Sequence, residues 1–176
     1  MLRFDHAGRT YAQAHIEKAA EFLPRLAKAA ATRGDQTATR VFVSDFAEWI
    51  ELGVKAHVPD FVDVADRFHI RQHLYTTAEA LYGKKSPRAK KWSASMAKRL
   101  AEQGGGSPAG RLRRLKLYYA DLTHQRAALN RAAFLDRHAE QLHYPEWIAR
   151  DLPVDCGGID SLCKQLGTRL KAGGRR

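Results

Sequence analysis

The stretch VFVSDFAEWIELGVKAHVPDFVDVAD, residues 41–66, carries the strongest structural signal in this chain. Its two apolar runs, VFVSD (41–45) and FVDVAD (61–66), enclose a segment at 47–57 that has the apolar spacing of a helix. Short apolar runs joined through a helix are typical of parallel strands in an α/β sheet. Each run closes on an aspartate, Asp45 or Asp66. Because active sites in such sheets gather at the carboxyl ends of the strands, both carboxylates are candidate site residues.

The chain before this stretch predicts two further elements. TYAQAHI (10–16) alternates as a short strand does, and residues 17–33 have helical spacing that ends at Arg33 and Gly34. Pro24 lies inside that helix and predicts either a kink or a later start. Together with the two apolar runs, this gives a sheet of about three strands.

After Asp66 the pattern becomes helical, and GGGSP (104–108) is its clearest break. Residues 145–153 contain two prolines and predict an extended connection. Helices are expected at 67–82, at 88–103, at 109–144 as one long helix or two, and at 158–171. The sequence therefore predicts a helix-rich α/β protein, with a partial α/β core at 1–66, a helical insertion at 67–145 and a C-terminal helix at 146–176 that completes the core.

The composition is that of an ordinary globular protein with a strong positive charge. Among 176 residues, 30 Lys+Arg oppose 19 Asp+Glu, so the formal net charge is +11, and 44% of the residues are hydrophobic. This charge favours a polyanionic partner. No apolar run approaches the ~20 residues that a membrane helix needs, and the N-terminus lacks an apolar signal core. Cys156 and Cys163 do not form a CxxC pair, so we expect reduced thiols in a cytoplasmic protein.

Each strand-ending aspartate has a structural alternative to a catalytic role. Asp45 precedes a helix and could be its N-cap, which is the commoner role for a lone aspartate there. Asp66 could likewise cap the helix at 67–82, with His69 in its first turn. His69 and His73 are four residues apart on the face of Asp66, a spacing that zinc sites use, but no further ligand is evident. A capped, packed helix and a zinc site are therefore both open.

A third acid lies in CGGIDSLCK (156–164). Asp160 is near a helix start, and Lys164 lies four residues further, on the same helix face. An acid with a lysine one turn away can hold a metal ion while the lysine touches a phosphate. The alternative is a surface Asp–Lys pair, which contributes roughly a few tenths of a kcal/mol.

Basic residues are concentrated in three clusters. The first contains Lys84, Lys85, Arg88, Lys90, Lys91, Lys98 and Arg99 and no acid, the second contains Arg111, Arg113, Arg114 and Lys116 beside Tyr118 and Tyr119, and the third contains Arg169, Lys171, Arg175 and Arg176. Cations at this density neutralise phosphates and release counterions, and neighbouring aromatic rings can stack on unpaired bases. The alternative is a solvated helix face. With the net charge of +11, nucleic-acid contact is the favoured interpretation.

Four segments, taken in order, resemble insertion-sequence transposases of the ISKra family, in the Mutator-like group of DDE enzymes. They are VFVSDFAEWI (41–50), FVDVADRFHIRQHL (61–74), LHYPEWIARDLPVDCGG (142–158) and GIDSLCKQLGTRLKAGGRR (158–176). They are similar to the family's strand ending in Asp-Gly-Ala, its Asp-x-x-His block, its tyrosine-led approach to a glycine turn and its Glu-x-x-x-Cys-Lys helix. Each motif is weak alone, and the ordered set is more specific.

The resemblance implies a ribonuclease-H-like sheet that binds DNA at transposon ends and cleaves and transfers its strands. It implies that Asp45 is the second catalytic carboxylate and Asp160 the third, and that both are ligands of Mg²⁺ or Mn²⁺ in a two-metal site. Asp66 and His69 correspond to the accessory Asp-x-x-His signature. The basic residues Lys164, Arg169 and Lys171 would then contact DNA, together with the first two clusters.

The chain also departs from the family. The family's first carboxylate lies upstream of Asp45, where this chain has only Asp5 and Asp35, and neither follows a strand-like run. The family has glycine after the second carboxylate, and this chain has Phe46. We therefore expect a truncated or degenerate transposase segment that is inactive alone, and the alternative is a non-catalytic, basic nucleic-acid-binding protein. An incomplete sheet leaves an exposed edge, which favours association between copies.

Overall fold

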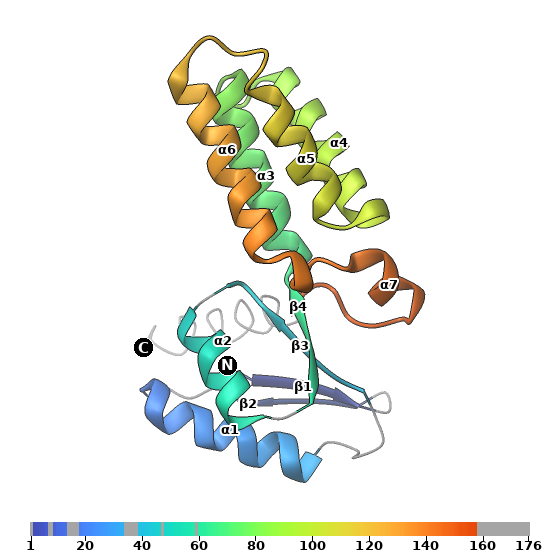
Figure 1. Cartoon of the computed structure of the whole chain (residues 1–176). Coiled ribbons are helices and arrows are strands. Elements are labelled where there is room, and N and C mark those ends of the chain that lie inside the picture. The colour runs from blue at the N-terminus through green and yellow to red at the C-terminus, as the bar shows by residue number, and fades with distance from the viewer. Residues whose placement is uncertain are drawn as a thin grey trace, which may run out of the picture. The chain divides into compact units, whose positions relative to one another are not determined.

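The computed structural model divides the chain into two compact units (Figure 1). The first unit comprises Met1–Val62 and Asp155–Arg176, and the second, called here the helical unit, comprises Asp63–Val154. The structure describes residues 2–6, 9–13, 18–33, 39–46, 48–58 and 60–157. The expected helix at 158–171 lies outside these residues. Within them, no helix combines the length and the apolar composition that crossing a membrane requires.

The strands form two separate pairs among the described residues. β1 (Leu2–His6) and β2 (Arg9–Gln13) are antiparallel, with Leu2 opposite Gln13. β3 (Arg40–Ser44) and β4 (Phe61–Ala65) form a small parallel pair, and α2 (Glu48–His57) lies between them in sequence. The α/β character is therefore present, but the expected single sheet of about three strands is replaced by two pairs. β1 was missed because LRFDH alternates apolar and charged residues too briefly to stand out.

The core of the first unit packs α1 (Ala19–Arg33) and α2 beside the β3–β4 pair. Gly53 allows α2 to approach α1, because a Cβ atom at this position would lie 2.4 Å from a methyl carbon of Leu23. The rings of Phe42 and Phe61, one from each strand, meet edge to face with centroids 5.9 Å apart. α1 begins at Ala19 and continues through Pro24, so the expected later start of this helix is wrong. The core residues are Leu26, Val54 and Val58, with Phe22, Ala27, Ala30, Phe42 and Phe61 packed against them.

The helical unit is a bundle in which α3, α4, α5 and α6 lie side by side, as Figure 1 shows. Every fourth or third residue of α3 is buried, which is the periodicity that predicted this helix. Gly83 ends α3 with φ 91°, a left-handed backbone that glycine adopts without strain. The helices are α3 (Arg67–Tyr82), α4 (Pro87–Gln103), α5 (Gly106–Leu115), α6 (Leu122–Arg137) and α7 (Tyr144–Ala149).

One sequence-based prediction in this unit is confirmed and another is wrong. GGGSP breaks the helical pattern, because α4 ends at Gln103 and α5 begins at Gly106, with Pro108 in the first turn of α5. The expected extended connection at 145–153 contains α7, whose Pro145 also lies in the first helical turn. A proline there is favourable because its missing N–H would have had no partner within the helix. The residues 109–144 form α5 and α6, which is the two-helix alternative.

Candidate functional site

Asp45 directly follows β3 and is exposed. The next residue, Phe46, has φ 70°, a left-handed conformation in which a side chain costs roughly 1 kcal/mol relative to glycine. The family that this segment resembles has glycine at that place. Phe46 therefore occupies a backbone position that suits glycine better.

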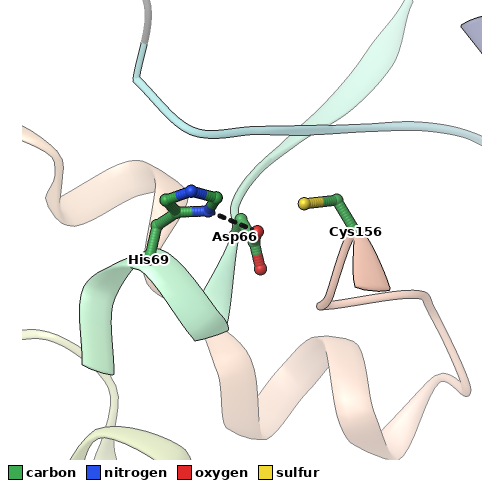
Figure 2. Close-up of side chains that lie close together, drawn as sticks. All are labelled: Asp66, His69 and Cys156. Atoms are coloured by element: carbon green, nitrogen blue, oxygen red, sulfur yellow. Dashed lines mark hydrogen bonds and ion pairs between the residues drawn. The ribbon is translucent and has the colours of Figure 1, made fainter. Parts of the chain in front are cut away.

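Asp66 is the N-cap residue of α3, and its side chain is fully buried. One carboxylate oxygen accepts a hydrogen bond from the backbone N–H of Phe68 at 3.0 Å. The other lies 2.6 Å from Nδ1 of His69 (Figure 2). Capping the helix satisfies a backbone N–H that has no partner within α3. Both oxygens of Asp66 are therefore engaged inside the first turn of its own helix.

The contact with Asp66 selects the tautomer of the neutral His69 ring. Because a carboxylate oxygen accepts hydrogen bonds, the nitrogen that faces it, Nδ1, carries the proton. Nε2 is then the nitrogen with a free lone pair, which is the arrangement of a histidine that acts as a base or binds a metal ion. The His69 side chain is 30% exposed, against 0% for Asp66. Asp66 can thus cap α3 and orient His69, while Nε2 of the His69 ring stays available to accept a proton or bind a metal ion.

Cys156, which Figure 2 also labels, is a third side chain of a metal-binding type. Cys156 belongs to the first unit, whereas the Asp66–His69 pair belongs to the helical unit. Two ligands are fewer than a zinc site uses. Within the helical unit, the described residues therefore supply no complete zinc site.

His73, the other histidine of the zinc alternative, has a different environment. Its ring packs against Phe134 with centroids 5.1 Å apart. Burial lowers the pKa of His73, and the positive charge of Arg131 lowers it further. Arg131 is itself half-buried, and its Nε donates to the hydroxyl of Thr77 at 3.1 Å. A fixed cation next to His73 opposes a second cation, so this region does not favour a metal ion.

The described residues do not test the expected magnesium or manganese site. Asp45 belongs to the first unit, and Asp160 lies outside the described residues. Asp66 has both oxygens engaged in α3. The two-metal site predicted at Asp45 and Asp160 therefore stays a prediction.

Most of the first basic cluster converges with the second in the structure. The short turn between α3 and α4 and the connection between α5 and α6 lie at the same end of the bundle (Figure 1). They line one open pocket, to which α3, α4 and both sides of the α5–α6 connection contribute. The exposed cations near these segments, named here the basic end, are Lys84, Lys85, Arg88, Lys90, Lys91, Arg111, Arg114 and Lys116.

Arg113 differs from its neighbours in the second cluster. Its guanidinium forms an ion pair with Asp136 of α6. Arg114 is the next residue, and the described part of the chain provides no ion pair to it. Lys164, Arg169 and Lys171 lie outside the described residues, so their predicted contacts with nucleic acid stay predictions.

Three residues of these sites were missed from the sequence. Tyr82 and His124 line the pocket at the basic end, and Arg131 packs beside His73. In the sequence, the position of Tyr82 two residues before Lys84 was the one sign that an aromatic ring lies beside the first basic cluster. Arg131 and His124 come from α6, and only helix packing brings them to α3.

No protein-family model, no curated protein and no solved structure matches this chain. The transposase resemblance therefore rests on the sequence motifs alone. The geometry of the described residues is the independent basis for a functional proposal.

Proposed function

We propose that this chain binds nucleic acid and that the basic end of the helical unit contacts the phosphates. The observation that carries the proposal is the convergence of Lys84–Lys91 with Arg111–Lys116. These segments are about twenty residues or more apart in sequence and meet at one end of the bundle. A merely solvated helix would spread its cations along its length. Concentrated cations instead create a positive field that attracts a polyanion.

The acids near this end leave these cations largely uncompensated. Glu79 accepts a hydrogen bond from the backbone N–H of Lys85 at 2.8 Å. Asp121 caps α6 by accepting from the N–H of Thr123 at 2.9 Å, and its other carboxylate oxygen faces Nδ1 of His124. Among the described residues, neither carboxylate forms an ion pair with a lysine or arginine of the basic end. The lysine and arginine heads of the basic end face solvent, where phosphates can reach them.

The experiment is a salt titration of DNA binding by the full chain and two double variants. Lys84→Ala with Lys90→Ala removes two charges from the basic end. Lys98→Ala with Arg150→Ala removes two exposed charges that pair with Glu102 and Glu146 elsewhere in the unit. If both lysines contact phosphates, the slope of log K against log salt falls by about 1.8 for the first variant only. Equal slopes for both variants, or binding that ignores salt, would overturn the proposal.

A narrower proposal is that the chain derives from a DDE-type transposase with a ribonuclease-H-like core. Two observations support it. Asp45 directly follows β3, which pairs in parallel with β4, and Phe46 occupies a left-handed position where the family has glycine. This proposal concerns origin and fold, and no step of DNA binding depends on a metal ion.

The test of the narrower proposal is the DNA on both sides of the reading frame, translated in all frames. A strand-ending aspartate upstream and flanking inverted repeats would support a segment of a transposase. Flanks without either feature, next to an independent promoter, would overturn it. DNA binding would then stand as the property of a separate protein.

A further inference from the structure

The pocket at the basic end differs from the surrounding surface in its aromatic walls. It is open to solvent and has a volume of about 560 Å³, within the range of sites that hold small organic groups. No acid occurs among the described residues that line it. The lining residues come from α3, α4, α5 and α6 and from the α5–α6 connection. Those with an aromatic ring or a positive charge are Tyr82, Arg88, Tyr118, Tyr119 and His124.

The rings of this pocket form a connected wall. Tyr119 stacks on His124, with centroids 5.2 Å apart and an interplanar angle of 18°. Tyr82 lies against Tyr119 at 6.5 Å and against Trp92 at 5.8 Å. Burial, together with a hydrogen bond between the side chains of Tyr82 and Tyr119, raises the pKa of Tyr82 to about 12. The Tyr82 hydroxyl therefore stays protonated at neutral pH and can donate a hydrogen bond.

Tyr118, which also lines this pocket, exposes its aromatic ring to solvent. It is 79% exposed, and Leu117 beside it is 75% exposed. Both residues lie in the connection between α5 and α6, next to the stacked ring of Tyr119. An exposed tyrosine next to a stacked pair offers a further stacking surface to a planar ligand.

Positive charge surrounds this wall. The guanidinium carbon of Arg88 lies 4.7 Å from the centroid of the Tyr82 ring. Arg111 is close enough for its charge to act on the Tyr82 hydroxyl, and Lys84 and Lys85 follow directly after α3. A ligand that is both planar and attached to anionic groups fits this combination. An unpaired base with phosphates on either side has both properties.

We propose that this pocket takes an unpaired base of a nucleic-acid strand, which stacks on the tyrosine rings while the basic end holds the flanking phosphates. The inference rests on the proposed function and adds that the substrate is single-stranded at this position. Duplex DNA keeps its bases stacked on one another, so it offers phosphates but no base to the pocket. Single-stranded nucleic acid is therefore the tighter ligand.

The experiment measures binding of the full chain to two strands of equal length by fluorescence anisotropy. One strand carries adenine bases, and the other is abasic, so the two share their phosphates and differ in stacking. We expect the base-bearing strand to bind about 10-fold more tightly or better. Tyr118→Ala should remove most of this preference and leave binding to the abasic strand unchanged. Tyr118 is largely exposed, so its loss does not threaten the fold.

Phe68→Ala is the matched control, because it removes a half-exposed ring at the other end of α3. It should leave the preference intact. Equal affinities for both strands, with binding that still weakens in salt, would overturn the stacking inference and leave the proposed function standing. Absence of binding to both strands would overturn both. Displacement of the base-bearing strand by an equimolar free mononucleotide would assign the pocket to nucleotides and overturn its assignment to a strand.

Discussion

At the Asp66 end of the helical unit, polar side chains are buried and bonded to one another, whereas at the basic end they are exposed and surround open aromatic rings. Gln141 illustrates the Asp66 end. Its Oε1 lies 2.7 Å from Nδ1 of His138, and its Nε2 donates a hydrogen bond to the carboxylate of Asp63 at 2.8 Å. The Tyr144 hydroxyl donates to the carbonyl of Ala65 at 2.8 Å. Tyr118 and Lys84 illustrate the second end, where side chains face solvent.

The difference separates structural from functional roles in one bundle. Buried polar groups that bond to one another hold the chain in place, and each becomes costly if its partner is removed. Exposed cations and rings add little to stability and are available to a ligand. We therefore expect substitutions at the Asp66 end to change folding, and substitutions at the basic end to change binding.

The largest expected effect is that of Asp66→Ala. It removes the N-cap of α3 and the partner of His69, so the free energy of unfolding should fall by about 3 kcal/mol. Urea unfolding of the full chain measures this. Asp66→Asn is the matched control, because asparagine also caps helices, and it should lose less. An alanine variant as stable as the original chain would show that Asp66 has no structural role.

Tyr144→Phe should cost less, about 1–2 kcal/mol, because it leaves the buried carbonyl of Ala65 without the tyrosine hydroxyl. The control is the same substitution at the basic end. Tyr118→Phe removes a hydroxyl from a side chain that is largely in water, so it should leave thermal stability unchanged. If the two variants lost equal stability, the expected difference in stability between the Asp66 end and the basic end would be wrong.

Stability should also fall as the pH drops below about 6.5, the usual pKa of histidine. Burial first, and then the charges of Arg131, His69 and His138, lower the pKa of His73 in the folded state. Below pH 6.5 the unfolded chain then binds a proton at His73 more readily than the folded chain does. Unfolding free energies at pH 7.5 and 5.5 test this. His73→Gln should reduce the difference between them, and an unchanged difference would refute the role of His73.

The smallest effect concerns neighbouring arginines of α5. Arg114→Ala should lower the salt slope of DNA binding by about 1, as expected for one lost phosphate contact. Arg113→Ala should change the slope less, because Asp136 already compensates the Arg113 charge. Comparison of the two slopes is the measurement. A larger change for Arg113 would place the contact surface on another side of α5.

The sequence revealed what is local and missed what depends on packing. It gave the bounds of α3 because Asp66 and Gly83 mark its ends chemically. It missed α7 because Pro145 was interpreted as a sign of extended chain, although proline also begins helices. The pairing of β3 with β4 followed from two apolar runs joined by a helix.

The candidate functional residues were likewise predictable where they are close in sequence and not where helix packing brings them together. The basic clusters were visible as runs of lysine and arginine, but their meeting at one end depends on how the helices pack. Arg113 and Asp136 are 23 residues apart, so their ion pair could not be foreseen. The Asp66–His69 contact was foreseeable because a spacing of three residues places both in one helical turn.

Hydrogen exchange of the full chain, with and without a single-stranded oligonucleotide, tests the central claim most directly. If the basic end is the binding surface, added protection of backbone amides should be confined to residues near 82–91 and 111–124. The first turn of α3, with Asp66 and His69, should be unchanged. Protection centred on Asp66 and His69, with none at the basic end, would contradict the account and move the binding site to the opposite end of the bundle.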